Sequence, residues 1–172
     1  MSGEEYLFPL SFGQQRLWFL DQVAPGSAVY NIPLAVTIET AVDSDVLERS
    51  LNEVVRRHEV LRTRFEAGQG QPVQVVMPEM RIRLEQTDLR GLPLPEQERA
   101  AAEHANDESR RGFDLSAGPL LRARLVQLQG RHVLLLTLHH IVCDAWSLNV
   151  LWQELAAIWS WRALWRSAGD PI

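Results

Sequence analysis

Lysine is absent from this 172-residue chain, so all 17 of its basic residues are arginine. The 22 acidic residues give a formal net charge of -5, and charges of both signs are interspersed along the sequence. A nucleic-acid-binding protein needs a basic patch or stripe, which this distribution excludes. The hydrophobic fraction of 46% is typical of a globular domain that buries its own core.

Cysteine is nearly absent too: Cys143 stands alone, which excludes an internal disulfide. No run of 18 uncharged apolar residues occurs, so we expect no membrane span. The first residues, MSGEEYLFPLSFGQQR, lack the basic and apolar regions of a secretory signal, and we expect a cytoplasmic protein. A glycine-rich phosphate loop and the Cys/His spacing of a structural metal site are also missing, so we expect neither a directly bound cofactor nor a metal.

Hydrophobic periodicity divides the chain into alternating helical and extended segments. It predicts helices over 11–23, 43–58, 96–111 and 145–166, and strands over 30–40, 61–66, 73–77, 82–86, 120–128 and 132–138. This order is typical of an α/β (α+β) two-layer sandwich in which helices pack on a mixed sheet. The 96–111 helix has only an alanine-rich, weakly apolar face, and we expect it at the surface.

The stretch HHIVCDAWS, residues 139–147, joins the last predicted strand to the last predicted helix. One interpretation is purely structural. Asp144 would cap the helix by accepting hydrogen bonds from the backbone N–H of Trp146 or Ser147, which stabilises a helix by about 0.5–2 kcal/mol. Because side chains alternate along a strand, His139 and His140 would point to opposite sides.

The other interpretation of this stretch is a proton-handling site, which needs only one of the histidines. Histidine has an ordinary pKa near neutral pH, and beside a cleft it can accept a proton from an attacking amine or hydroxyl. The helix N-terminus would add partial positive charge and N–H donors for a developing oxyanion. Two histidines also suggest a metal, but no third ligand lies at a suitable spacing.

Four stretches of the chain together resemble the condensation domain of non-ribosomal peptide synthetases. They are LSFGQQRLWFLDQVAPGSAVYNIP at 10–33, RHEVLRTRF at 57–65, FDLSAGPLLRARL at 113–125, and HHIVCDAWS, which is similar to the family signature HHxxxDGxS. A trimeric coenzyme A-dependent acetyltransferase of the same fold fits less well, because RHEVLRTRF and YNIP favour the synthetase family. The resemblance covers nearly the whole chain.

The resemblance implies a chloramphenicol acetyltransferase-like fold, in which two lobes form a V-shaped pair with the active site in a tunnel between them. Carrier proteins would deliver substrates on phosphopantetheine arms, and an acceptor amine would attack a donor thioester to give a peptide bond. His140 would assist this attack, and His139 would be a supporting residue that points away from the tunnel. Asp144 would be structural and paired with Arg62, and Ser147 closes the signature.

The chain departs from the family pattern at Ala145, where the family usually has glycine. If this position is simply the first residue of the helix, alanine costs nothing. If a substrate must approach its backbone N–H, the added methyl narrows the tunnel.

The chain also ends at Ile172, before the C-terminal lobe of the family. We therefore expect residues 1–172 to be the N-terminal lobe, which would be inactive alone because one wall of the site is missing. The alternative is a non-catalytic remnant that docks a carrier protein or a neighbouring synthetase domain. The two interpretations differ in whether the chain catalyses peptide-bond formation once the second lobe is supplied.

Five of the six tryptophans lie in the last predicted helix. Trp152, Leu155 and Trp159 share a face that would pack on the sheet of this lobe. Trp161 and Trp165 would need another cover, from the missing lobe, a neighbouring domain or a local bend of the helix end. Cys143 is expected to be a small buried filler, since a reactive thiol needs a lowered pKa.

Overall fold

A computed structural model gives the structure of residues 5–68 and 70–167, with side chains as far as residue 159. The helices are α1 (Phe12–Val23), α2 (Ser44–Arg57), α3 (Leu94–Arg110) and α4 (Ala145–Ser167), with short 3-10 helices η1 (Ala28–Tyr30) and η2 (Glu59–Arg62). The strands are β1 (Tyr6–Pro9), β2 (Asn31–Ile38), β3 (Thr63–Gly68), β4 (Gln71–Val76), β5 (Leu84–Asp88), β6 (Leu121–Leu128) and β7 (Arg131–His139). Every predicted element is present, with ends shifted by a few residues. Strand β1 was not predicted.

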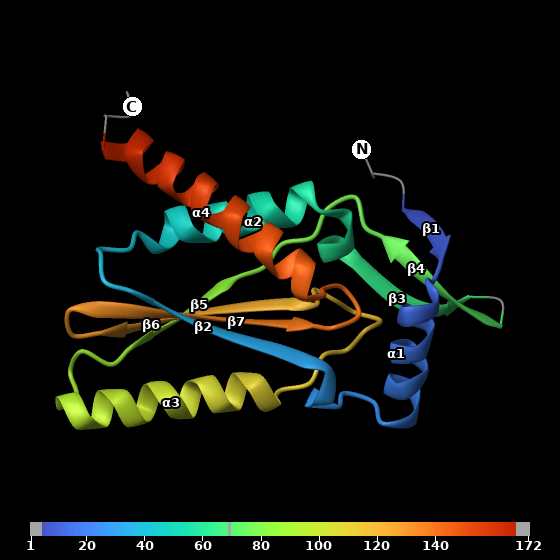
Figure 1. Ribbon diagram of the computed structural model, residues 1–172, viewed down its shortest axis with the longest axis horizontal. Coiled ribbons are helices and arrows are strands. Elements are labelled where there is room, and N and C mark those ends of the chain that lie inside the picture. Colours follow the sequence, from blue (N-terminus) through green and yellow to red (C-terminus); the bar gives the residue numbers. More distant parts are fainter. Residues whose placement is uncertain (1–4, 69, 168–172) are drawn as a thin grey trace.

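A four-stranded mixed sheet in the order β2-β7-β6-β5 forms the centre of the molecule (Figure 1). Strands β5 and β6 are parallel, and the other pairs are antiparallel. A hairpin joins β6 to β7 through Gly130, whose φ of 80° is one that glycine adopts without strain. Asn31, the first residue of β2, lies opposite His139, the last residue of β7.

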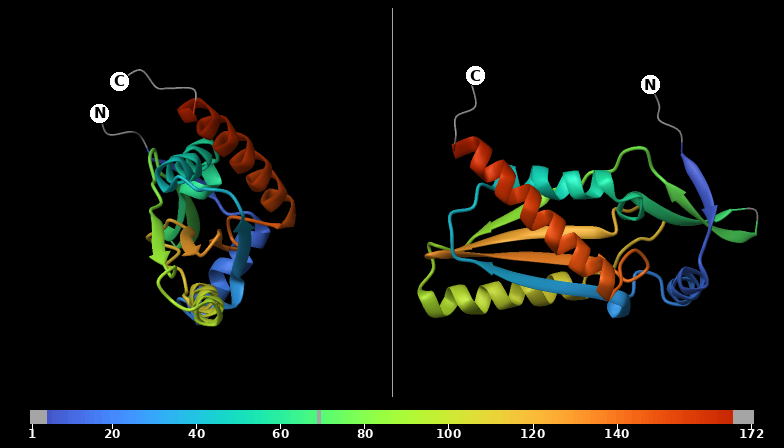
Figure 2. Two further views of the ribbon diagram at one scale, coloured as in Figure 1. Left: turned by 90° about the vertical axis from the view of Figure 1, so that its left-hand side faces the viewer. Right: turned by 45° about the horizontal axis from the view of Figure 1, so that its top comes forward.

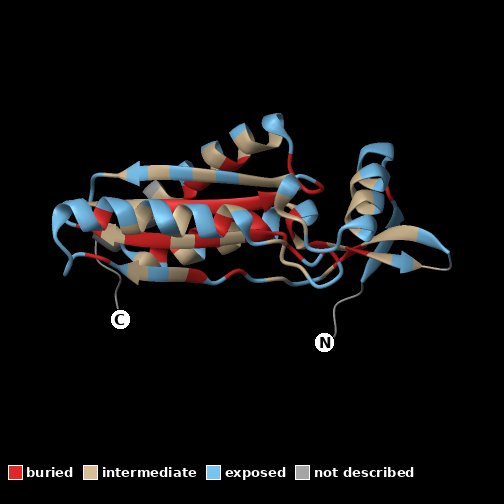
Figure 3. Cartoon of the chain, turned by 90° about the horizontal axis from the view of Figure 1, so that it is seen from below, coloured by how far each residue is buried: buried red, intermediate tan, exposed pale blue. Residues whose placement is uncertain are grey.

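Helices cover both faces of this sheet, α2 and α4 on one and α3 on the other (Figures 1 and 2). Alternation along β7 explains the arrangement: Leu134 and Leu136 belong to the core shared with α2 and α4, whereas Leu135 packs with α3. The mixed α/β class is confirmed. The expected two layers gain a third, because the alanine-rich face of α3 is apolar enough to pack on the sheet while its outer face stays exposed (Figure 3).

Local capping and apolar periodicity account for α2 and α4. Asp43 caps α2 by accepting hydrogen bonds from the N–H groups of Asp45 and Val46, both 3.0 Å. Buried Leu151, Leu155 and Ile158 attach α4 to the core, and Trp152 and Trp159 pack at its margin. The side chains of Trp161 and Trp165 lie outside the described residues.

A smaller sheet, in the order β1-β4-β3, and helix α1 occupy the end of the molecule at which β7 finishes (Figures 1 and 2). Ser11 caps α1 in a capping box with Gln14, as its position before the apolar run predicts. No residue of α1 is buried, and Phe12 is 91% exposed. Apolar surface is therefore open beside the predicted site. Among the described helices none is long and apolar enough to cross a bilayer.

Candidate active site at the end of strand β7

The two adjacent histidines face opposite sides of β7, as the strand period predicts. His139 is 1% exposed, while His140 is exposed. The backbone N–H of His139 donates to the carbonyl of Leu120 at 3.1 Å, and that of His140 donates to the carbonyl of Tyr30 at 2.8 Å. Neighbours on both sides thus fix the backbone at this point, and η1 is brought against the end of β7.

His139 is held as a neutral, buried imidazole. Its ring makes edge contacts with the rings of Tyr30 and Phe113, with centroid distances of 6.2 and 6.1 Å. Its Nδ1 accepts a hydrogen bond of 3.1 Å from the N–H of Ile141. Burial, and to a smaller degree the charge of His140, lowers the pKa of His139 to about 4. The side chain cannot exchange protons with a substrate in solution, and its contacts are those of a residue that shapes the turn.

His140 is exposed, and one of its two ring nitrogens is held by the turn. Its Nδ1 lies 2.8 Å from the carbonyl oxygen of Cys143. A carbonyl can only accept, so this hydrogen bond assigns the proton to Nδ1 and leaves the lone pair on Nε2. Within the described part of the chain, Nε2 makes no hydrogen bond. His140 is therefore oriented as a base that is accessible from outside the lobe.

Asp144 is the N-cap of α4. Its Oδ1 accepts hydrogen bonds from the N–H and the hydroxyl of Ser147, at 2.8 and 2.7 Å. These bonds, with the side-chain bond the stronger, lower the pKa of Asp144. The structural interpretation of this residue is supported by the geometry, and Ser147 contributes through the cap.

The expected ion pair between Asp144 and Arg62 does not form among the described residues. Arg62 instead donates to the carbonyl of Met77 and pairs with Glu59 at 3.1 Å. The physical reason is local: the cap occupies the Asp144 carboxylate, and η2 turns Arg62 toward the end of β4. The prediction of this pair was wrong, although both residues keep structural contacts.

Ala145 and Cys143 lie on either side of the cap. Ala145 is the first residue of α4 and is exposed, which matches the alternative in which alanine costs nothing. Cys143 is buried, and burial followed by the charge of Asp144 raises its pKa to about 11. Its thiol is protonated near neutral pH, as expected for a buried filler.

Three aromatic residues around the turn were not predicted to be part of the site. Tyr30 and Phe113 enclose His139, and Trp146 is 78% exposed at the rim of an apolar pocket of about 140 Å³. Cys143, whose carbonyl binds His140, also lines this pocket. Both Tyr30 and Phe113 fall inside the stretches that carry the family resemblance, which is the signal that could have indicated them. The described residues contain no cluster of three or more side chains suited to a metal ion.

Acid is expected to destabilise the lobe through His139. Its folded pKa of about 4 lies below its ordinary value of 6.5, so the unfolded chain takes up a proton first as the pH falls. Stability from this residue is complete above pH 6.5 and is lost between there and pH 4. Between about pH 7 and pH 5 the loss amounts to about 2 kcal/mol.

Urea unfolding at the two pH values measures this loss, and His139→Asn is the matched control. Asparagine offers an oxygen to the N–H of Ile141 but does not titrate. The variant is expected to lose less stability than the wild type over the same interval. Equal losses in both proteins would show that His139 is not the source.

The chain also matches known proteins. The family model described as "Condensation domain" matches residues 4–163. The chain therefore belongs to the condensation-domain family, whose solved members share the chloramphenicol acetyltransferase-like fold. The resemblance drawn from its sequence motifs is confirmed.

Its relatives are components of peptide synthetases. The chain is 47% identical to part of a linear gramicidin synthase of Brevibacillus parabrevis over 152 residues, which are 88% of this chain and 2% of that protein. It is 43% identical to the phosphinothricin tripeptide synthetase PhsC of Streptomyces viridochromogenes over 164 residues, which are 95% of this chain and 15% of that protein. The chain thus corresponds to a small part of each curated relative.

Solved structures show the same fold. The starter condensation domain of the rhizomide synthetase RzmA superposes with a TM-score of 0.84 at 24% identity, covering 97% of this chain and 41% of that one. The first condensation domain of the CDA synthetase gives a TM-score of 0.81 at 26% identity, covering 97% and 43%. The chain spans about two fifths of the length of these solved structures.

Proposed function

We propose that residues 1–172 form the N-terminal lobe of a cytoplasmic condensation domain, which makes a peptide bond when its second lobe is present. The substrates would be a donor thioester and an acceptor amine, each on the phosphopantetheine arm of a carrier protein. The observation that carries the proposal is the exposed ring of His140, in which the Nδ1 hydrogen bond to Cys143 leaves the lone pair on Nε2. It supplies a base where the family signature places one.

The proposed reaction needs one proton acceptor. The acceptor nitrogen attacks the thioester carbonyl, a C–N bond forms and the C–S bond breaks. The proton lost by the amine passes to Nε2 of His140 and then to the departing thiolate, which leaves as the thiol. The N-terminus of α4, capped by Asp144, places partial positive charge at the same end of the lobe.

Water around His140 explains why we expect no reaction from this lobe alone. His140 is exposed, and so are Phe12 and Trp146 at the same end of the molecule. A reaction that depends on orienting two carrier-bound substrates needs a second wall, which orders them and removes water. We propose that the rest of the condensation domain supplies this wall.

A complementation assay tests the proposal. The chain is supplied alone, and separately joined to the C-terminal portion of a related condensation domain, with aminoacylated donor and acceptor carrier proteins. Mass spectrometry of the acceptor carrier is expected to show dipeptide only for the joined form. A joined protein that folds and binds both carriers but yields no dipeptide would instead favour the docking remnant.

A further inference from the structure

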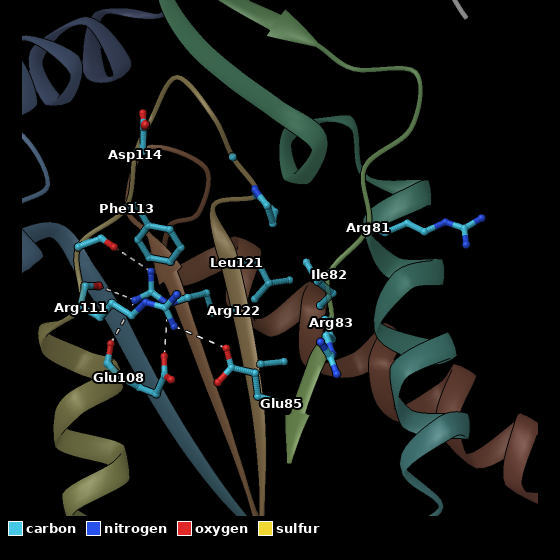
Figure 4. Close-up of a pocket in the computed structure, with 14 residues that line it drawn as sticks. Arg81, Ile82, Arg83, Glu85, Glu108, Arg111, Phe113, Asp114, Leu121 and Arg122 are labelled. Carbon is cyan, nitrogen blue, oxygen red and sulfur yellow. Dashed lines mark hydrogen bonds and ion pairs between the residues drawn. The ribbon is translucent and has the colours of Figure 1, made fainter. Parts of the chain in front are cut away.

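Arg122, on β6, lines an open cleft of about 400 Å³ together with Phe113 (Figure 4). Its guanidinium is fixed by several acceptors. It donates to the carbonyls of Glu108 at 3.2 Å, Gly112 at 3.0 Å and Arg111 at 2.5 Å, and it pairs with the carboxylate of Glu108 at 3.3 Å. Carbonyls at a helix C-terminus lack partners within the helix, so Arg122 caps the end of α3. With 16% of its side chain exposed, it is a fixed element of the structure.

The ring of Phe113 rests against this fixed guanidinium. The Cζ atom of Arg122 lies 3.8 Å from the ring centroid, a cation–π contact, and Phe113 is 5% exposed. The ring also contacts the His139 ring, at 6.1 Å and an interplanar angle of 81°. A side chain at Gly112 would place its Cβ 1.8 Å from the carbonyl oxygen of Gly26. The backbone just before Phe113 therefore packs tightly against the Gly26 backbone, which limits movement of Phe113 away from Arg122. Phe113 therefore transmits the position of Arg122 to His139.

The ring of His139 in turn determines the turn that carries His140. The Nδ1 atom of this ring accepts a hydrogen bond from the N–H of Ile141. The backbone carbonyl of His139 accepts another from the N–H of Val142 at 3.1 Å. These bonds hold Ile141 and Val142, the two residues that precede Cys143, and the Cys143 carbonyl fixes the tautomer of His140. The contacts are continuous from the end of α3 to the ring of His140.

We propose that Arg122 is a positioning residue for His140, acting through the ring of Phe113 and the turn at His139. The inference rests on the role proposed above for His140, and it adds residues outside the signature stretch to the device that orients this base. Neither Arg122 nor Phe113 contacts His140, so their effect is on its orientation and tautomer.

Arg124 provides a matched comparison within the same strand. It shares the partner of Arg122, binding the Glu108 carboxylate at 2.9 Å, and it also bonds to Thr87 at 3.1 Å. Its side chain is 19% exposed, close to the 16% of Arg122. In the described part of the chain, however, it has no contact with an aromatic ring. Replacing either arginine removes its ion pair with Glu108, but only replacement of Arg122 also removes the contact with the Phe113 ring.

The test measures the tautomer of His140 by nitrogen-15 NMR of the histidine side chains in the 172-residue chain. The wild type and Arg124→Met are expected to show a single Nδ1–H tautomer for His140. Arg122→Met and Phe113→Leu are expected to show a mixture of the two tautomers, because the turn is no longer held. Phe113→Leu leaves the arginine and its ion pair in place, so it reports on the ring even if Arg122→Met fails to fold.

The activity of the joined domain is a second readout. A base displaced by a fraction of an ångström to about 1 Å loses about 10- to 100-fold in rate, so kcat is expected to fall by this much in Arg122→Met and to be retained in Arg124→Met. A fixed His140 tautomer in Phe113→Leu, or equal effects of the two arginine changes, would overturn the proposal. The NMR result stands without activity, so failure of the proposed function is distinguishable from failure of this inference.

Discussion

Replacement of His140 by alanine is expected to lower the condensation rate of the joined domain by about 10²–10⁴-fold, the range for loss of a general acid–base group. Nε2 of His140 is the atom that we assign to proton transfer, and the methyl group of alanine cannot replace it. The stability of the lobe should change little, since His140 is exposed and, within the described residues, its ring has one hydrogen bond, to Cys143. Initial rates of dipeptide formation and urea unfolding measure the two effects separately.

His104→Ala is the control for this substitution. His104 lies within α3, on the helix that covers the far face of the sheet, and alanine is favourable in a helix. This variant is expected to keep the wild-type rate. A His140→Ala domain that retains its rate would contradict the assignment of the base, whatever the tautomer measurements show.

Replacement of Glu108 by leucine is expected to destabilise the lobe by about 3 kcal/mol. The Glu108 carboxylate is 9% exposed and binds both Arg122 and Arg124. Removing one partner of a buried ion pair costs about 3–5 kcal/mol, and the lower end applies because both guanidinium groups keep some contact with water. Burial alone raises the pKa of Glu108, but the hydrogen bonds and charges of Arg124 and then Arg122 outweigh it and lower the pKa.

The matched control lies on the same helix. Glu98 pairs with Arg131 near the start of α3, but its side chain is 61% exposed, so Glu98→Leu is expected to cost less than about 1 kcal/mol. Urea unfolding near neutral pH compares the two variants. The Glu108 difference should shrink in acid, because a carboxylate with a lowered pKa loses its contribution as the pH falls through the folded value. Similar small losses in both variants would show that the buried network contributes little.

The sequence predicted features that depend on neighbouring residues. Alternation placed His139 and His140 on opposite sides of the strand, and the aspartate before the last apolar run indicated the cap at Asp144. These features follow from a strand period of two and from bonds within a few residues. The motif resemblance then identified the family without help from the structure.

The sequence did not predict features that depend on which distant side chains meet. A helix pattern with only a weak apolar face gave no sign that Glu108 would be buried, because its partners lie on β6. The Arg62–Asp144 pair was expected from family resemblance, yet a local acceptor, Glu59, binds Arg62, and local donors of Ser147 bind Asp144. Strand β1 was missed because none of its residues is buried and it exists only by pairing with β4.

The position of β2 at one edge of the central sheet has a consequence for the order of assembly. Within the described residues its sheet partner is β7, so some 100 residues separate the two strands in the chain. During synthesis from the N-terminus, β2 emerges long before its partner, whereas the β6–β7 hairpin closes over a few residues. Asn31 and His139 are paired, and the N–H of His140 reaches the carbonyl of Tyr30, so the base is fixed in the same event that docks β2. The site is therefore completed by the slow, non-local pairing of β2 with β7. In a nascent chain that lacks β7, strand β2 is unpaired and is a segment that chaperones would shield.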